Sequence, residues 1–366
     1  MKLKQILLTI LFAAFLFVGS ALCYLSPAKA YSESERRPLA QMPELQLASV
    51  ANGKFMEDFE AYAADNFPFR EVLRSLKALF STEVFQKLDN NGLFVADGHI
   101  SKLDEPENEA MMNHAAERFS YLYETYLKEK DTKIYLSIIP DKNFLLAKPN
   151  GFPSLDYVGF TERMKEKTPY MQYIDVTEYL SLEDYYTTDT HWRQEKITDI
   201  AKSLAKAMGT DVTSEYQVNT LDNPFYGVYS GQLAMPFPPD TIHYLTNQTL
   251  ENCKVTYYDT GAPKAGELYN MKKAYGKDPY EMFLSGVAPL ITIENPSATS
   301  QKELVLFRDS FGSSLAPLLV EGYQKITVVD IRYVQSSMLG QFVNFEHCDV
   351  LFLYSTTLLN NSLALK

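Results

Sequence analysis

Two short segments of the chain carry residue types that catalyse acyl transfer when they lie together. In the first, Thr187-Thr188-Asp189-Thr190-His191-Trp192, an aspartate precedes a histidine by two residues, directly before a helix predicted from Gln194. At this spacing the carboxylate can fix the imidazole tautomer and leave the other ring nitrogen free to act as a base. Two other interpretations stay open: Asp189 or Thr190 caps the helix while His191 is an ordinary surface residue, or Asp189 and His191 are metal ligands.

The second segment is Phe307-Arg308-Asp309-Ser310-Phe311-Gly312, between a predicted buried strand and a predicted helix. A serine on a sharp strand-to-helix turn presents its hydroxyl at the edge of the sheet, where the free N–H groups of the helix stabilise an oxyanion. The alternative is that the aspartate and the serine only cap the helix. The two segments are complementary, since one supplies a base with its orienting carboxylate and the other a nucleophile with oxyanion donors.

The elements that position these segments alternate between strands and helices. Apolar spacings of three and four predict helices over 55–67, 70–85, 108–130, 194–208 and 313–321, and short apolar runs predict strands over 133–140, 173–176, 303–307, 325–330 and 349–354. A hairpin is expected over 92–98. Such alternation indicates a parallel sheet with helices on both faces, in which sites form at the carboxyl ends of the strands. Lys142 follows a strand end and could face the pocket, but a solvated lysine is the main expectation.

The predicted organisation has three parts. Residues 1–30 combine two early lysines, an apolar run and Ala28-Lys29-Ala30, which indicates a signal peptide or an uncleaved membrane anchor. Residues 31–50 form a charged, proline-containing linker, and residues 51–366 form one domain. Within that domain, the proline-rich stretch of about 210–298 is expected to be an irregular insertion with short antiparallel strands.

Composition excludes some functions. The 366 residues are 46% hydrophobic and carry a net charge of −12, without a basic cluster outside the leader, so nucleic acid is not an expected partner. A polyanionic polymer would also be repelled, which favours a neutral or zwitterionic glycan. Beyond the leader only Cys253 and Cys348 remain; they form either one disulfide or two buried thiols.

The two chemical segments resemble the paired motif of the AlgX/AlgJ-type, SGNH-hydrolase-like proteins related to alginate O-acetyltransferases, and particularly their Gram-positive branch, the DHHW proteins. Those proteins share the Asp-x-His-Trp and Asp-Ser-Phe elements in this order, whereas the serine comes first in most SGNH hydrolases. The resemblance extends over nearly the whole exported chain, through further matching stretches at 35–39, 59–62, 65–70, 139–142, 226–231 and 329–333.

The resemblance implies an SGNH-hydrolase-like α/β fold, a parallel sheet flanked by helices with a permuted motif order, and a catalytic triad of Asp189, His191 and Ser310. It also implies an extracytoplasmic O-acetyltransferase that needs no cofactor or metal. A membrane-bound O-acyltransferase would supply the acetyl group, and an acetyl-serine would pass it to hydroxyls of an exported or cell-wall polysaccharide. A carbohydrate acetylesterase and a non-catalytic, glycan-binding envelope protein are the alternatives.

The remaining site residues follow from the same resemblance. The first expected oxyanion donor is the N–H of Ser310, with Gly227 second, while the family asparagine has no assigned position. Arg332 and Tyr229 are predicted substrate contacts, although packing would explain both equally well. The aromatic residues of the insertion, Tyr226, Tyr229, Phe237 and Tyr244, are the predicted glycan-binding surface.

Overall fold

The computed structural model describes residues 2–104, 106–259 and 262–366, which form two compact units. We call them the N-terminal unit, which runs to Asn91 and includes Val228–Phe237, and the sheet unit, formed by Gly92–Gly227 and Pro238–Lys366. The boundary predicted at residue 50 lies inside the N-terminal unit.

The N-terminal unit begins with an apolar helix. Within α1 (Lys2–Leu25), the stretch Leu3–Cys23 is long and apolar enough to cross a membrane, and none of it is buried, consistent with a signal peptide or an anchor. The other elements of this unit are β1 (Tyr31–Ser32), β2 (Arg37–Pro38), α2 (Leu47–Ala51), α3 (Lys54–Asp65), α4 (Arg70–Leu79), the π-helical turn η1 (Phe80–Val84) and α9 (Val228–Leu233).

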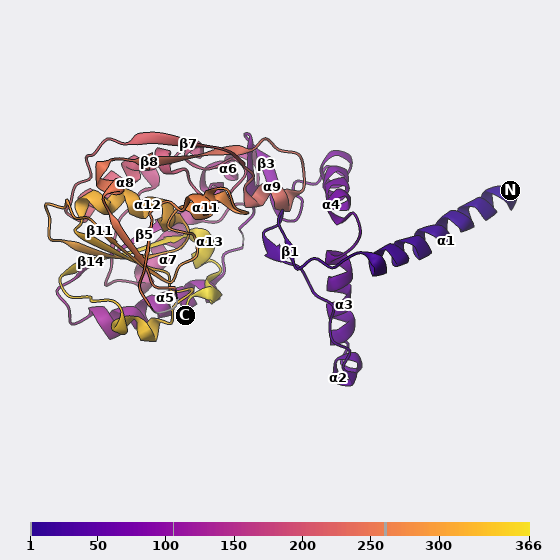
Figure 1. Cartoon of the computed structure of the whole chain (residues 1–366), viewed down its shortest axis with the longest axis horizontal. Helices are drawn as coiled ribbons and strands as arrows, with labels where there is room; N and C mark the ends of the chain where they lie inside the picture. Colours follow the sequence, from indigo (N-terminus) through magenta and orange to yellow (C-terminus); the bar gives the residue numbers. More distant parts are fainter. Residues whose placement is uncertain (1, 105, 260–261) are drawn as a thin grey trace. The chain divides into compact units, whose positions relative to one another are not determined.

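The sheet unit is built on eight strands in the order β10-β9-β11-β13-β12-β14-β5-β6. Figure 1 labels β5, β11 and β14 of this sheet. Five of them, β13 to β6 in that order, pair in parallel, so the sheet is mostly parallel as predicted. The insertion adds three antiparallel strands at one edge. The bounds are β5 (Lys133–Ile139), β6 (Gln172–Tyr173), β9 (Lys254–Tyr257), β10 (Lys264–Gly266), β11 (Leu290–Glu294), β12 (Glu303–Arg308), β13 (Lys325–Val329) and β14 (Cys348–Ser355).

Two smaller ribbons and a set of helices complete this unit. The ribbons are β3 (Leu93–Ala96) with β4 (His99–Lys102), the expected hairpin, and β7 (Gln217–Phe225) with β8 (Asp240–Thr246). The α-helices are α5 (Glu109–Leu122), α6 (Asn143–Leu146), α7 (Tyr157–Lys167), α8 (Thr198–Ala207), α10 (Gln248–Glu251), α11 (Met271–Ala274), α12 (Phe311–Leu319) and α13 (Thr356–Leu359). The helix predicted over 194–208 is divided into a 3₁₀ turn, η6 (Gln194–Lys196), and α8.

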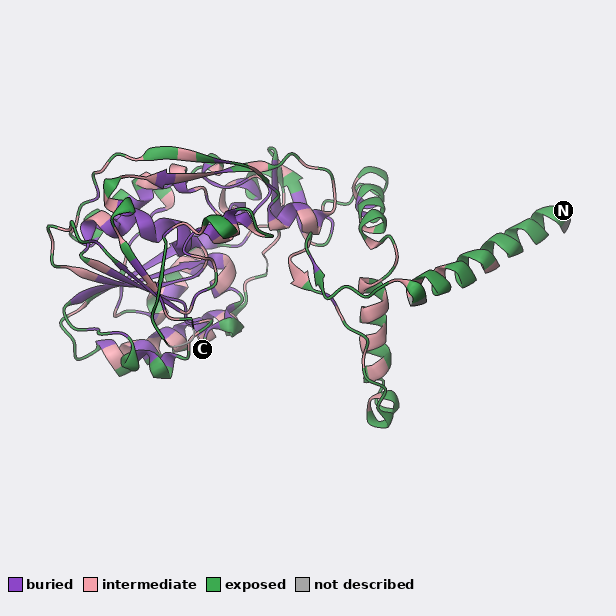
Figure 2. Cartoon of the chain, in the orientation of Figure 1, coloured by how far each residue is buried: buried purple, intermediate pink, exposed green. Residues whose placement is uncertain are grey.

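The core lies on both faces of the sheet because successive side chains of a strand point to opposite sides. In β12, Leu304 and Leu306 pack with α8 and α12, whereas Val305 and Phe307 pack with α5 and α7. Burial is therefore continuous along the central strands (Figure 2). Cys253 and Cys348 are free thiols, so the disulfide alternative is not realised.

The order of the parallel strands locates the expected site. The parallel strands lie side by side in the order β13-β12-β14-β5-β6. When β12 is numbered as strand 1, this order becomes 2-1-3-4-5, which is the doubly wound order of flavodoxin-like sheets. In the chain itself, β5 and β6 come before β12. In such sheets ligands bind where the order reverses, here at the carboxyl ends of β12 and β14. Ser310 follows β12 at this point.

Candidate active site

The turn that carries Ser310 is fixed by its neighbour Asp309. The carboxylate of Asp309 accepts one bond from the N–H of Phe311 (3.0 Å) and another from the N–H of Ser355 (2.8 Å), the last residue of β14. Ser310 occupies the N-cap position of α12, but its side chain makes no capping bond. The capping interpretation therefore fits Asp309, and the Ser310 hydroxyl is available for other contacts.

Asp189, His191 and Ser310 form one hydrogen-bonded row. His191 Nε2 lies 2.8 Å from Ser310 Oγ, and His191 Nδ1 lies 2.6 Å from Asp189 Oδ1. The side chain of Asp189 is fully buried, while that of His191 keeps 12% of its surface exposed. The alternative in which Asp189 or Thr190 caps the helix is wrong, since η6 follows Arg193 and has no side-chain cap.

A half-buried carboxylate outside the predicted set holds the loop that carries Asp189. Asp240 accepts the N–H and hydroxyl of Thr187 (2.9 and 2.8 Å) and the N–H and hydroxyl of Thr188 (2.8 and 2.5 Å). Behind the loop, Gly227 leaves no room for a side chain, because an added Cβ would lie 2.4 Å from Asp189 Cβ. Together they restrict where the Asp189 carboxylate can lie.

The residues after His191 attach the loop to the first turn of α12. Trp192 Nε1 donates to Phe311 O (3.0 Å) and to Ser314 Oγ (2.9 Å). Gln194 Nε2 donates to Ser314 O at 2.8 Å. Because α12 begins at the nucleophile turn, these bonds tie the base to the serine that it faces.

Tyr280, from the insertion, covers one face of the base. Its ring stacks on the imidazole of His191 with centroids 3.9 Å apart and planes 9° apart. The hydroxyl lies 2.9 Å from Ser314 Oγ, and burial raises the pKa of Tyr280 well above its usual range, so the phenol stays protonated. Tyr280 lies in the 3₁₀ turn η7 (Pro279–Met282), and no motif in the sequence indicates it.

The two expected oxyanion donors differ in availability. Within residues 2–104, 106–259 and 262–366, no acceptor is bonded to the N–H of Ser310, which begins the N-terminal turn of α12. The N–H of Gly227, in contrast, donates to Thr188 Oγ1 at 2.8 Å. The prediction that the N–H of Gly227 is the second oxyanion donor, and so contacts the substrate, is not supported, because this amide is used and Gly227 packs behind Asp189.

Most of the other predicted contact residues are used in internal contacts, whereas Tyr226 is exposed. Arg332 donates to both carboxylate oxygens of the buried Asp330, at 2.9 and 2.7 Å, and Asp330 also pairs with Arg308 at 3.3 Å. Tyr229 is only 7% exposed and belongs to the N-terminal unit. Of the remaining aromatic residues of the predicted glycan surface, Tyr226 is exposed, Phe237 is half-buried in the N-terminal unit, and Tyr244 packs against Tyr269.

Lys142 is the clearest correction to the sequence analysis, because it is buried instead of solvated. Its side chain is 1% exposed, and Nζ donates to Tyr186 O (2.8 Å) and Thr187 O (3.2 Å). Burial lowers the pKa of Lys142 to about 7, against the opposing effect of Asp189 and other carboxylates. These hydrogen bonds from Lys142 therefore hold the loop that precedes Asp189.

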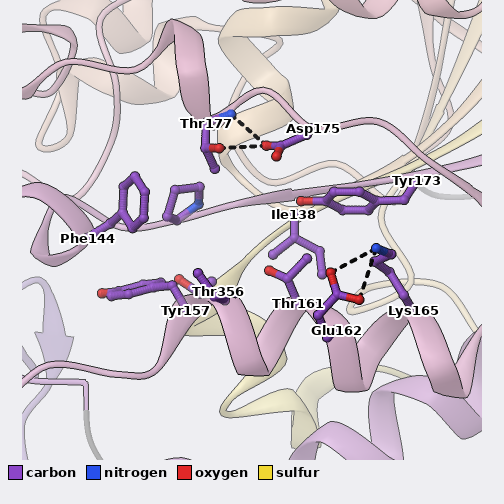
Figure 3. A pocket seen from close by; sticks show the side chains of 12 residues that line it. Ile138, Phe144, Tyr157, Thr161, Glu162, Lys165, Tyr173, Asp175, Thr177 and Thr356 are labelled. Carbon is purple, nitrogen blue, oxygen red and sulfur yellow. Dashed lines mark hydrogen bonds and ion pairs between the residues drawn. The ribbon is translucent and has the colours of Figure 1, made fainter.

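A separate cavity of about 350 Å³ opens beside the carboxyl ends of β5 and β6 (Figure 3). Its walls include the rings of Phe144, Tyr157 and Tyr173, and the carboxylates of Glu162 and Asp175. This volume is within the range of small-ligand sites.

Buried polar contacts connect this cavity with the nucleophile turn. Thr356 lines the cavity and directly follows Ser355, whose N–H bonds the Asp309 carboxylate. Next to it, Tyr157 donates to both oxygens of the buried Asp141 at 3.0 Å. Burial, together with the nearby carboxylate of Asp104, raises the pKa of Asp141 to about 6.

In the described part of the chain, no group of three or more His, Cys, Asp or Glu side chains is arranged to hold a metal ion. No family model and no curated protein sequence matches the chain.

Solved structures do match it. A DHHW family protein from Eubacterium siraeum, solved at 1.49 Å, aligns with a TM-score of 0.59 and 19% identity over 74% of this chain and 93% of that one. PatB1 from Bacillus cereus aligns with a TM-score of 0.58 when it carries a sulfonyl adduct, with 18% identity over 73% of this chain and 95% of that one. Without the adduct the TM-score is 0.57, with 18% identity over 74% and 97%.

The chain has the fold of the DHHW family protein and of PatB1. The resemblance predicted from the two motifs is thereby confirmed at the level of the fold. The O-acetyltransferase domain of Pseudomonas putida AlgJ aligns more weakly, with a TM-score of 0.46 and 12% identity.

Proposed function

We propose that this protein is a serine-dependent O-acetyltransferase that moves an acetyl group through an acetyl-serine to hydroxyls of an exported or cell-wall polysaccharide. The observation that carries the proposal is the row Ser310 Oγ–His191 Nε2 (2.8 Å) and His191 Nδ1–Asp189 (2.6 Å). A serine, a base in hydrogen-bond reach and a carboxylate that orients the base are what acyl transfer requires. A non-catalytic glycan-binding protein has no need of this row.

The first half of the reaction forms the acetyl-serine. His191 Nε2 takes the hydroxyl proton of Ser310 while Oγ attacks the acetyl carbon of the donor, and the carbonyl oxygen becomes an oxyanion. The N–H of Ser310 and the N-terminal turn of α12 are suitably located to stabilise that charge. The donor oxygen then leaves with the proton from His191. By resemblance, the donor is a membrane-bound O-acyltransferase.

The second half repeats these steps with the acceptor. A sugar hydroxyl gives its proton to His191 Nε2 and attacks the acetyl carbon, and Ser310 leaves with that proton. Water in the place of the sugar would make the protein an acetylesterase. The Asp189 carboxylate accepts the Nδ1–H of His191 in both halves, which keeps Nε2 free to accept a proton.

The cavity of Figure 3 is our candidate for holding a neighbouring sugar of the acceptor. It combines aromatic rings with carboxylates, which suits a neutral or zwitterionic glycan. It also lies at the carboxyl edge of the sheet, as does Ser310. Neighbouring strands are about 4.8 Å apart, so the ends of β12 and β5, two strands away, are separated by roughly 10 Å, the reach of a short oligosaccharide.

Serine labelling tests the enzymatic proposal. The full chain is treated with an aromatic sulfonyl fluoride, the reagent class suggested by the sulfonyl adduct of PatB1, and the modified residue is identified by mass spectrometry. We expect modification of Ser310, and loss of both labelling and p-nitrophenyl acetate hydrolysis in Ser310→Ala. If the parent is not labelled and Ser310→Ala hydrolyses the ester at the parent rate, the proposal fails.

Acceptor choice separates transfer from hydrolysis. Neutral, zwitterionic and polyanionic oligosaccharides are supplied with the ester, and acetylated sugar is measured against free acetate. Transfer predicts acetylated neutral or zwitterionic sugars. Free acetate alone, with every acceptor, would identify an esterase.

A further inference from the structure

Helix α4 in the N-terminal unit turns its apolar side outward. Ala78 and Ser81 are buried, and the side chains of Arg70 and Arg74 are only 15% and 14% exposed, so these four positions form the inner side. The opposite side repeats large apolar residues at spacings of three and four. It consists of Phe69, Val72, Leu73, Leu76, Leu79 and Phe80, which are 72%, 58%, 44%, 45%, 48% and 51% exposed. We call these six residues the α4 stripe.

Ion pairs and backbone contacts prevent α4 from rolling this stripe inward. Arg70 Nη2 lies 2.6 Å from Glu35 Oε2, and Arg74 Nη2 lies 3.4 Å from Glu35 Oε1. Arg74 also donates to Gly231 O at 2.8 Å. Turning the apolar side inward would break these charged contacts. They therefore set the orientation of α4.

A second set of bonds fixes the start of α4 close to the end of α1. Asp65 accepts two bonds from Arg37, at 2.8 and 2.6 Å, and Asn66 Oδ1 accepts the N–H of Lys29 at 2.8 Å. Lys29 follows Leu25, the last residue of α1, by four residues, a span of at most about 14 Å. The α3–α4 turn thus cannot lie far from the end of a helix of membrane-spanning length.

We propose that the α4 stripe is a second membrane contact, which lies in the outer surface of the same lipid bilayer that the retained α1 spans. Water is an unfavourable environment for six clustered apolar side chains. Amphipathic helices bury such a side about 5–10 Å into the boundary between headgroups and acyl chains. The short connection to α1 keeps the bilayer permanently within reach, so little additional affinity is needed. This inference does not depend on the enzymatic proposal.

Tryptophan quenching by brominated lipid tests the inference. The only native tryptophan, Trp192, is fully buried in the sheet unit, so a tryptophan placed on α4 reports on its own surroundings. The full chain is reconstituted into vesicles of acyl-brominated phosphatidylcholine with phosphatidylglycerol. Leu76→Trp and Leu73→Trp probe the stripe, and Leu363→Trp, at a 72% exposed leucine of the sheet unit, is the matched control.

We expect both stripe variants to emit at shorter wavelength and to lose about half of their emission in brominated vesicles, as acyl-chain contact requires. The control should stay within a tenth of its emission in unbrominated vesicles. Equal quenching of stripe and control variants overturns the inference. A shift to shorter wavelength without quenching also overturns it, because protein, either a second copy or a membrane partner, would then cover the stripe.

Discussion

Replacing Tyr280 tests whether the stacked ring holds the base in line with Ser310. Tyr280→Leu removes the ring that lies 3.9 Å from the imidazole centroid and leaves the Asp189 bond as the main restraint on His191. Such ring pairs contribute about 0.5–1.5 kcal/mol, which corresponds to a roughly 2- to 12-fold loss in rate. If the imidazole also rotates out of line, the loss reaches about 100-fold. We therefore expect kcat/KM for p-nitrophenyl acetate to decrease by a factor between about 2 and about 100.

Tyr280→Phe is the matched control, since it keeps the stacked ring and removes only the hydroxyl. Ser314 Oγ keeps its bond from Trp192, so no buried group is left unpaired, and the free energy of unfolding should fall by about 1 kcal/mol. Its kcat/KM should stay within about threefold of the parent. Both variants are checked by thermal unfolding and by the rate of Ser310 labelling. Equal damage in the two variants would refute positioning by the ring and assign the effect to the hydroxyl.

Three further predictions concern stability, pH and the acceptor. Gly227→Ala, whose Cβ would lie 2.4 Å from that of Asp189, should lower kcat about 100-fold and the free energy of unfolding by about 1–3 kcal/mol; an active, fully stable variant would contradict the packing argument. Because the pKa of Asp141 is raised from 3.8 to about 6, its stabilising contribution is present below pH 3.8 and lost as pH rises through 6. Urea unfolding of the parent relative to Asp141→Asn should therefore show a decrease of up to about 3 kcal/mol between pH 4 and pH 7, and a constant difference would exclude the titration. Asp175→Ala, in the cavity, should raise KM for an oligosaccharide acceptor about fivefold, whereas Glu183→Ala, outside it, should not; equal values would remove the cavity from the acceptor site.

The pattern of apolar residues was sufficient to predict the central strands of the sheet unit and most of the helices that cover them. β14 is buried along its whole length and β12 from Leu304 onward, and their centres, Leu304–Phe307 and Val350–Tyr354, are short apolar runs. The predictions were less accurate where pattern is short: β6 covers only Gln172–Tyr173, and the helix predicted from Gln194 begins as a 3₁₀ turn. Local hydrogen bonds, not hydrophobic spacing, decide such ends.

The site could be predicted where chemistry and local sequence coincide, as in the segments of His191 and Ser310. Asp240 and Tyr280 were not found, because a single aspartate or tyrosine in a proline-rich stretch carries no pattern. Lys142 was misplaced, since a lysine after a strand is usually solvated, whereas here the carbonyl oxygens of residues distant in sequence accept hydrogen bonds from its Nζ. Contacts between residues this far apart in sequence are set by the tertiary fold, so the local sequence does not predict them.

The position of β14 has a consequence for how the protein is made. This last strand lies between β12 and β5, and pairs with β5 across more than 200 residues of chain. Until Cys348–Ser355 has emerged, the two parts of the sheet have no strand to join them, and Asp309 lacks the Ser355 amide that fixes the nucleophile turn. Pairings at this separation form slowly because loop closure comes first. The sheet is therefore completed only after Cys348–Ser355 has been made, and loss of this strand removes the centre of the sheet instead of a tail.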